Sequence, residues 1–228
     1  MKSPILFLLL LAVIPCSGQH KFRLTDPSDK VTVNIDVAEC DTDCHGRATF
    51  SFTRKGDSKP FQVVRLPDTQ IWLGDEGKPQ ANVTLLYDQQ SAVNFDDFNF
   101  DGHEDVAICD GNKGGYGSPT YRVYLYSKRV NKYVYAPTFS KISRDDSLGM
   151  FEVDRKKKML MRSSKDGCCW HRIEGFAVLG GQPKKIYEFT EDASKGGGDI
   201  VEIKTRRLVS GKWRTTIKHA KTAEYYKN

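Results

Sequence analysis

Short runs in which apolar and polar residues alternate recur along the chain, whereas no segment repeats apolar residues at helical spacing over three turns. Alternation with a period of two is typical of strands that bury one face. We therefore predict an all-β protein. The clearest runs are KVTVNIDV at 30–37, RATFSFTR at 47–54, YRVYLYS at 121–127, DIVEIKTRRLV at 199–209 and WRTTIK at 213–218.

Turn-forming segments rich in Gly, Pro, Asp and Ser divide these runs at short intervals. Such connections are too short for the crossovers that parallel strands need. They predict antiparallel hairpins and meanders, in a propeller-like or sandwich-like arrangement. No linker separates two compositional halves, so we expect residues 20–228 to form a single domain, with 75–80 as the rival boundary.

The first 18 residues have the pattern of a signal peptide: Lys2, an apolar run at 5–14, and small residues before a cleavage point after Gly18. An apolar run of this length is well short of the roughly 20 residues that span a bilayer. Pro15 before Cys16 argues against a lipid anchor. We expect an exported protein without a membrane span, in the periplasm or, alternatively, secreted.

Lys and Arg exceed Asp and Glu by 35 to 29, which gives a formal net charge of +6. Both signs are interspersed along the chain, and removal of Lys2 with the signal lowers the charge slightly. Such a mild excess favours solubility and the steering of an acidic partner. It does not indicate a nucleic-acid surface.

The chain has six cysteines, and Cys16 leaves with the signal peptide. In an exported protein the remaining odd number predicts disulfides and one free thiol or intermolecular bond. These residues are Cys40, Cys44, Cys109, Cys168 and Cys169. The first two flank three residues and could close a small loop, while the third could join either of the last two. A zinc site that includes His171 is the alternative.

An acidic loop lies between two short alternating runs and has the spacing D-x-N-x-D-G-x-x-D. Oxygen ligands two residues apart in a tight turn point to a common centre, and Gly102 permits the reversal. A full EF-hand would need a glutamate where Ile108 stands. We therefore predict a strand-loop-strand Ca²⁺ site of structural role. Its ligands are Asp97, Asn99, Asp101, His103 through its carbonyl, and Asp105.

A glycine-rich loop, CDGNKGGYGSPTYRVYLYS, follows the acidic loop and carries aromatic and hydroxyl side chains. It lacks the Lys-Ser/Thr pair of a phosphate-binding loop. Loops of this kind are either plain hairpin connections or partner-binding segments.

The segments DFNFDGHED, GGYGSPTYRVYLY and GCCWH make residues 90–178 similar to a family of exported calcium-binding immunity proteins, which protect bacteria from peptidoglycan hydrolases and are related to periplasmic lysozyme inhibitors. The resemblance implies an all-β fold, Ca²⁺ at the acidic loop, no catalysis, and a protein partner that is a peptidoglycan hydrolase or lysozyme. It implies that a loop lying beside the calcium, and held at one end by it, enters the enzyme cleft. The residues that it assigns to partner binding are Gly115, Tyr116, Gly117, Ser118 and Tyr121.

Two other classes of function have less support. Neither a Gly-x-Ser-x-Gly elbow nor a His-Glu-x-x-His helix is present, and the acid pairs 145–146 and 191–192 look like turn residues. We therefore expect that the protein is not an enzyme. A calcium-stabilised adhesion or glycan-binding module is the alternative, although such modules repeat the calcium loop and this chain has one copy.

Overall fold

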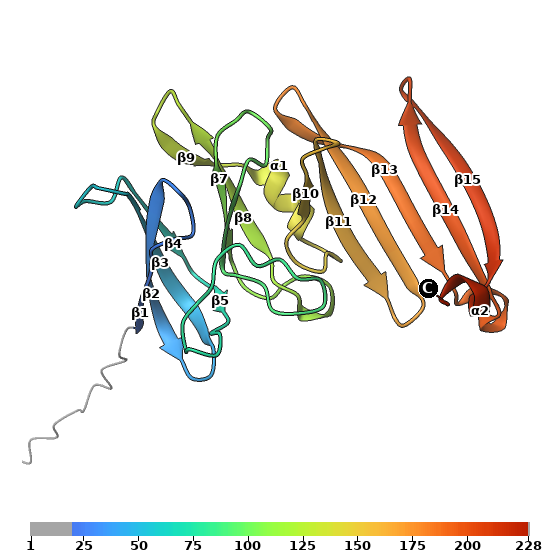
Figure 1. Cartoon of the computed structure of the whole chain (residues 1–228), viewed down its shortest axis with the longest axis horizontal. Coiled ribbons are helices and arrows are strands. Elements are labelled where there is room, and N and C mark those ends of the chain that lie inside the picture. Colours follow the sequence, from blue (N-terminus) through green and yellow to red (C-terminus); the bar gives the residue numbers. More distant parts are fainter. Residues whose placement is uncertain (1–19, 228) are drawn as a thin grey trace, which may run out of the picture.

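Three antiparallel sheets follow one another along the chain in the computed structural model, which describes residues 20–227 (Figure 1). The predicted signal peptide lies outside these residues. Within each sheet the strands are ordered as in the chain, except that β5 pairs with β3. The prediction of an all-β fold built from antiparallel hairpins and meanders is confirmed. No helix of the described residues is long and apolar enough to cross a membrane.

The first sheet contains β1 (His20–Leu24), β2 (Val31–Cys40), β3 (Cys44–Arg54), β4 (Gln62–Leu66) and β5 (Gln70–Ile71). The second contains β6 (Val93–Asp96), β7 (Asp105–Cys109), β8 (Tyr121–Ser127) and β9 (Lys132–Tyr135). The third contains β10 (Glu152–Asp154), β11 (Met159–Asp166), β12 (Trp170–Leu179), β13 (Gln182–Asp192), β14 (Ile200–Val209) and β15 (Lys212–Lys221). The helices are α1 (Pro137–Ser140) and α2 (Thr222–Tyr225), with 3-10 turns η1 (Gly115–Gly117), η2 (Lys141–Ser143) and η3 (Lys195–Gly198).

The core lies between the first two sheets and follows from the alternation of their strands. Alternate residues of β2 and β3 are buried, and they pack against β6 to β9 in one continuous cluster. The ring of Phe52 contacts Phe95 and Tyr133 edge to face, with centroids 6.3 and 5.5 Å apart. Each such pair adds roughly 0.5–1.5 kcal/mol beyond the burial of its area. Every residue of β7 is buried, so this strand lies inside the core.

The first half of β8 extends beyond β9, and the segment that contains α1 and η2 takes over the pairing there. The amides of Tyr121 and Val123 donate hydrogen bonds to the hydroxyls of Ser143 and Ser140, at 3.0 and 2.8 Å. Buried backbone N–H groups need such partners, because an unpaired one costs about 1–3 kcal/mol. This segment therefore completes the second sheet and closes its far end.

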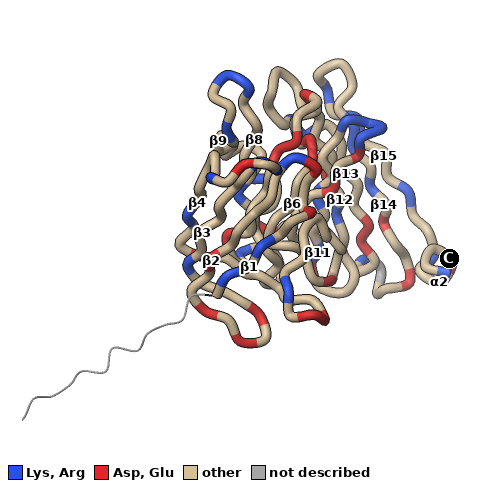
Figure 2. Tube along the Cα trace, turned by 60° about the vertical axis from the view of Figure 1, so that its left-hand side comes forward, with Lys and Arg blue, Asp and Glu red and all other residues tan. Residues whose placement is uncertain are grey.

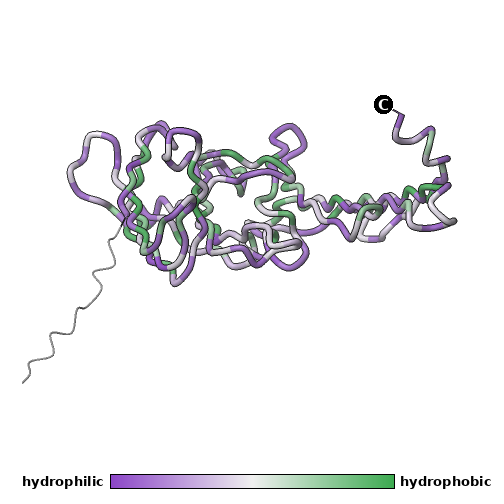
Figure 3. The backbone as a smooth tube through the Cα atoms, turned by 90° about the horizontal axis from the view of Figure 1, so that it is seen from below, coloured by the Kyte–Doolittle hydropathy of each residue, from purple (hydrophilic) through white to green (hydrophobic). Residues whose placement is uncertain are grey.

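The third sheet begins at the core and then extends away from it as a single layer (Figure 3). Leu160 of β11 is fully buried with the core cluster, whereas β15 is exposed at nearly every position. One face carries a ladder of ion pairs in place of apolar contacts. Its distances are 3.5 Å for Arg162 to Glu174, 2.8 Å for Lys185 to Glu174, 2.9 Å for Lys185 to Glu188 and 3.0 Å for Arg206 to Glu188.

Candidate functional site

The glycine-rich loop connects β7 to β8 and turns through η1, with Tyr116 at its tip. A Cβ atom on Gly114 would lie 2.6 Å from the carbonyl oxygen of Ser147, and one on Gly115 would lie 2.8 Å from that of Asp146. The amide of Gly115 donates to the Ser147 carbonyl at 2.9 Å. These two glycines therefore allow close packing of the loop on a neighbouring segment, which gives the loop a defined shape.

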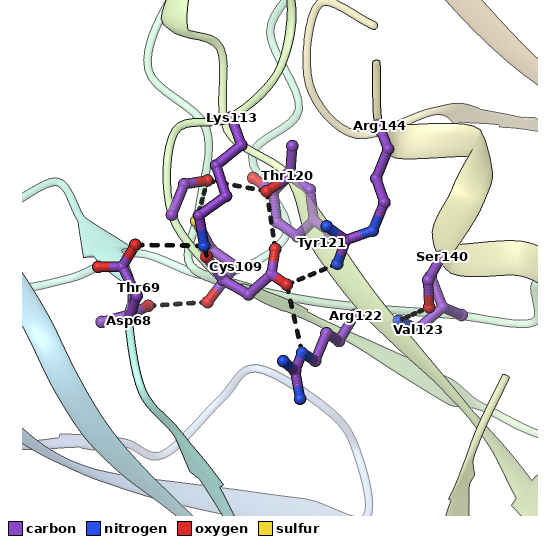
Figure 4. Close-up of polar contacts among 12 residues, drawn as sticks. Asp68, Thr69, Cys109, Lys113, Thr120, Tyr121, Arg122, Val123, Ser140 and Arg144 are labelled. Carbon is purple, nitrogen blue, oxygen red and sulfur yellow. Dashed lines mark hydrogen bonds and ion pairs between the residues drawn. The ribbon is translucent and has the colours of Figure 1, made fainter. Parts of the chain in front are cut away.

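Asp110 joins the two ends of this loop, among the side chains of Thr120, Arg122 and Arg144 that Figure 4 labels. Its buried carboxylate accepts hydrogen bonds from the Thr120 hydroxyl at 2.7 Å and from the side chains of Arg122 and Arg144. Lys113 donates to the Asp110 carbonyl at 2.7 Å and contacts Asp68. Burial opposes the charge of Asp110, but the bonds from Thr120 and the two arginines outweigh it and lower its pKa. Asp110 is therefore ionised at neutral pH and holds the base of the loop.

Tyr116 is one of two exposed tyrosines on either side of a lysine. Tyr116 is 63% exposed and Tyr87 is 60% exposed. The ammonium of Lys165 lies 4.8 and 4.7 Å from the centroids of their rings. The Gly167 amide donates a hydrogen bond to the Tyr116 hydroxyl. We call Tyr87, Tyr116 and Lys165 the tyrosine patch; the exposed Leu85 and Leu86 directly precede it.

Both tyrosines of the patch have a left-handed backbone conformation. The φ angle is 54° at Tyr116 and 64° at Tyr87. This conformation costs a residue with a Cβ atom roughly 1–2 kcal/mol. Strained residues of this kind cluster at binding and catalytic sites, where the surrounding structure enforces them. Six other non-glycine residues in the range 20–227 share this conformation, but only these two are also exposed large aromatic or apolar side chains.

The five residues expected to bind a partner do not all lie on this surface. Gly115, Tyr116 and Gly117 form the tip, and Ser118 follows it half-buried. The prediction that Tyr121 binds a partner was wrong. It is fully buried, and its hydroxyl donates to the Ser91 carbonyl at 2.9 Å, because the alternation of β8 turns its side chain inward. A partner could not reach it without unfolding the strand.

The acidic loop lies at the opposite end of the second sheet from the glycine-rich loop. The acidic loop precedes β7 and the glycine-rich loop follows β7, so the length of this strand separates the two loops. Five residues of antiparallel strand span about 17 Å. The expectation that a calcium site lies beside the partner loop is therefore wrong. A cation here would stabilise the end of the sheet, not the tyrosine patch.

The acidic loop is organised by its own carboxylates. Asp97 accepts hydrogen bonds from the amides of Asp101 and Gly102, at 3.0 and 2.8 Å, and Asp101 accepts one from His103 at 2.8 Å. The amide oxygen of Asn99 accepts a bond from Asp101 at 3.0 Å. Among residues 20–227, no group of three or more His, Cys, Asp and Glu side chains is already arranged to hold a metal.

Asp105 is the buried member of the loop. Its oxygens accept bonds from the amides of Phe98 and Tyr126, at 2.9 and 2.8 Å. Burial, with smaller contributions from Asp101 and Asp97, raises the pKa of Asp105 to about 7. None of these three carboxylates forms a salt bridge within the described part of the chain. All donors of this set are oxygens, the ligand type that Ca²⁺ takes, but among the described residues their carboxylates are not gathered into a metal-binding group.

Two other acids of this loop contact residues outside it. Asp96 forms a salt bridge with Arg155 at 2.7 Å. Glu104 is half-buried and accepts a hydrogen bond from Ser28. The loop is thus connected to the first and third sheets by its side chains.

The cysteines form two disulfides and leave one thiol, as the odd count predicted. Cys40 bonds to Cys44 across the β2–β3 turn, and Cys168 bonds to Cys169 in the β11–β12 turn. Cys109 is the buried free thiol, and burial raises its pKa to about 11. The possible bond from Cys109 to either of the last two is therefore absent. The same pairing occupies the sulfurs that the alternative zinc site would need.

Two members of the tyrosine patch were missed by sequence reasoning. Tyr87 and Lys165 are far from Tyr116 in the chain and meet it only in the folded protein. The apolar run TLLY at 84–87, set among turn residues, was a signal that could have indicated exposed apolar side chains in a loop.

Comparison of the sequence with protein-family models and with curated proteins gives no match. The fold is similar to a solved structure described as that of a Xanthomonas Type IV Secretion System related protein. The TM-score is 0.65, with 22% sequence identity, and the alignment covers 90% of this chain and 96% of that one. At this identity the likeness concerns the fold alone.

Proposed function

We propose that this chain is an exported calcium-binding protein that binds and inhibits a peptidoglycan hydrolase or lysozyme, and that the loop carrying Tyr116 enters the enzyme cleft. The observation that carries the proposal is the conformation of Tyr116. This residue is 63% exposed at the tip of a loop whose backbone is strained there. Exposed aromatic residues whose backbone conformation is enforced by the surrounding structure are typical anchors of protein interfaces.

The chemistry of the tyrosine patch matches the cleft of a glycoside hydrolase. Such a cleft has two carboxyl groups beside a groove shaped for sugar rings. The ring of Tyr116 could occupy a sugar subsite, while hydroxyls of Tyr116 and Ser118 donate hydrogen bonds. Lys165 adds a positive charge between the two tyrosines, which suits an acidic cleft.

The loop is also organised before it meets a partner. Asp110 closes its base, and Gly114 and Gly115 pack against the backbone of residues 146–147. A segment that is already ordered loses less conformational entropy on binding. Immobilising a flexible side chain at an interface costs about 0.5–1.5 kcal/mol. This support for the loop comes from Asp110 and replaces the support that calcium was expected to give.

Calcium has a separate place in the proposal. Asp97, Asn99, Asp101, Asp105 and the carbonyl of His103 would hold the ion by oxygen ligands alone. Bound there, the ion would neutralise carboxylates that have no cationic partner in the described chain, and so stabilise that end of the second sheet. It would take no part in contacts made by the tyrosine patch.

The similar solved structure supports the setting of the proposal. It is described as related to a type IV secretion system, which is compatible with an exported bacterial protein. Export to the periplasm would place this chain where peptidoglycan hydrolases act.

A lysis assay tests the proposal. A panel of peptidoglycan hydrolases is incubated with cell-wall substrate, with and without the mature protein. We expect inhibition of at least one enzyme, and loss of that inhibition in Tyr116→Ala combined with Ser118→Ala. Tyr135→Ala is the matched control, because Tyr135 is 45% exposed on β9, away from the patch.

The other outcomes of the same assay are equally informative. Inhibition that survives the double substitution would contradict the loop assignment. Lysis by the protein alone would identify an enzyme. Binding to glycan fragments without any effect on a hydrolase would support the adhesion or glycan-binding alternative.

A further inference from the structure

The net charge of the C-terminal hairpin equals the net charge of the whole chain. Residues 200–221 contain seven of the 35 Lys and Arg residues but one of the 29 Asp and Glu residues, and the rest of the chain has 28 of each. Lys and Arg recur along β15, where no acid interrupts them (Figure 2). A local excess of this size attracts acidic partners to that part of the surface.

Four of these cations share one face of the hairpin. Alternation places Lys212, Arg214 and Lys218 on the same side of β15, and Arg207 of β14 lies directly opposite Arg214. All four are exposed, and none forms an ion pair with another residue in the range 20–227. Like charges placed opposite one another destabilise a strand pair, so this arrangement does not serve the stability of the hairpin.

Within residues 20–227, no strand pairs with the outer edge of β15. It is the last strand of its sheet. The turn at Ser210 and Gly211 has φ angles of 50° and 76°, as in a two-residue hairpin that closes on a hydrogen-bonded pair. Pairing with β14 therefore uses alternate residues from Lys212 onward. The N–H and C=O groups left pointing outward belong to Trp213, Thr215, Ile217 and His219.

We propose that this edge docks an extended acidic segment of a partner protein, which adds to the third sheet as a further strand. Main-chain groups of an open edge bind such a segment, and alternate side chains select it. Acids on one face of the segment would meet Lys212, Arg214 and Lys218. Apolar residues on its other face would cover Trp213 and Ile217, which are 37% and 51% exposed.

A second copy of this chain does not fit the edge. Two β15 edges that paired with one another would bring their rows of cations together, and lysines on an edge strand are a known means of preventing that contact. An acidic strand, by contrast, would be attracted by these cations. The edge is also separate from the tyrosine patch, because three strands lie between β11, which carries Lys165, and β15.

Binding of a designed peptide to the mature protein tests the proposal. The probe is a labelled ten-residue peptide in which Glu alternates with Val, measured by fluorescence anisotropy. Its counterpart replaces each Glu with Lys. Two further versions carry N-methyl groups on the Val amides or on the Glu amides. An antiparallel added strand uses the Val amides for its bonds to β15, so methylation there should abolish binding, while methylation of the Glu amides should not.

Charge exchange is the second arm. Arg214→Glu combined with Lys218→Glu should weaken binding of the Glu peptide about tenfold or more and create binding of the Lys peptide. Lys128→Glu combined with Arg129→Glu is the matched control, because both residues are exposed in the β8–β9 turn. Thr215→Pro should also block binding, since it removes an outward N–H and leaves the pairing with β14 intact.

Several results would overturn the proposal. One is no binding of the Glu peptide, and another is binding that neither methylated version alters, since charge alone would then explain it. An equal loss of Glu-peptide binding in the Lys128→Glu and Arg129→Glu control variant would also mean that charge alone explains the binding. Binding of phosphatidylglycerol vesicles without binding of the peptide would assign the charge to a membrane surface. A dimer in sedimentation that Thr215→Pro abolishes would assign the edge to a second copy.

Discussion

Asp110→Asn removes the carboxylate that joins the two ends of the glycine-rich loop while keeping its size. The side chain of Asp110 is 5% exposed, and the two arginines that contact it are 36% and 30% exposed. Breaking a buried ion pair by removing one partner costs about 3–5 kcal/mol. Because both arginines can turn partly toward water, we expect about 2 kcal/mol, within the range for hydrogen bonds to charged groups.

The loss should depend on pH with a defined sign. The pKa of Asp110 is lowered in the folded protein from its ordinary value of 3.8. Its contribution to stability is therefore fully present above the unfolded pKa and is lost as the pH falls below about 4 through the folded pKa. The difference in the free energy of unfolding between wild type and Asp110→Asn should be largest near pH 7 and should shrink in acid.

Urea denaturation of both proteins at several pH values measures this difference. Asp68→Asn is the control, because Asp68 is 43% exposed and its one ion pair within the described residues is with Lys113, so its loss should cost less than about 1 kcal/mol. Trypsin provides a local readout, since a loosened loop should be cut faster after Lys113. Equal losses for the two variants, or a loss for Asp110→Asn that persists undiminished at pH 2, would refute the assigned role of Asp110.

Three further outcomes are expected. Calcium should raise the melting temperature and a chelator should lower it, whereas Asp101→Ala should abolish the difference; an unchanged melting curve with no calcium in elemental analysis would contradict the site. Mass spectrometry of the protein alkylated without reductant should find no alkylated thiol in the native protein and one alkylated thiol, Cys109, after denaturation. Five alkylated thiols would exclude the disulfides. Gly115→Ala should reduce both stability and inhibition, because its Cβ would lie 2.8 Å from the Asp146 carbonyl oxygen; wild-type values for both would show that the loop tolerates displacement.

The strands and the loops were accessible to sequence reasoning because their signals are local. Alternation at 31–37 and 48–52 predicted the buried faces of β2 and β3. The same alternation could have placed Tyr121 inside with Val123, but its nearness to the loop in sequence suggested exposure. The two ends of one antiparallel strand lie apart, so β7 alone could have shown that the acidic loop and the glycine-rich loop are not neighbours.

The contacts that define the candidate site were not accessible in this way. Arg144 reaches Asp110 across 34 positions of the chain, and Lys165 meets Tyr87 only because the third sheet starts beside the second. Such contacts depend on how the sheets pack, which no local pattern encodes. The exposed edge of β15 likewise follows from the order of strands in the sheet, since its own sequence would also suit a central strand.

Competition for the cleft tests the central claim most directly. A hydrolase that the protein inhibits is titrated with the protein, with and without a saturating oligosaccharide of N-acetylglucosamine in its active site. If the glycine-rich loop enters the cleft, the oligosaccharide should weaken binding of wild type in proportion to its own occupancy, and Tyr116→Ala should weaken binding without the sugar. A ternary complex of hydrolase, sugar and protein with undiminished affinity would contradict the account.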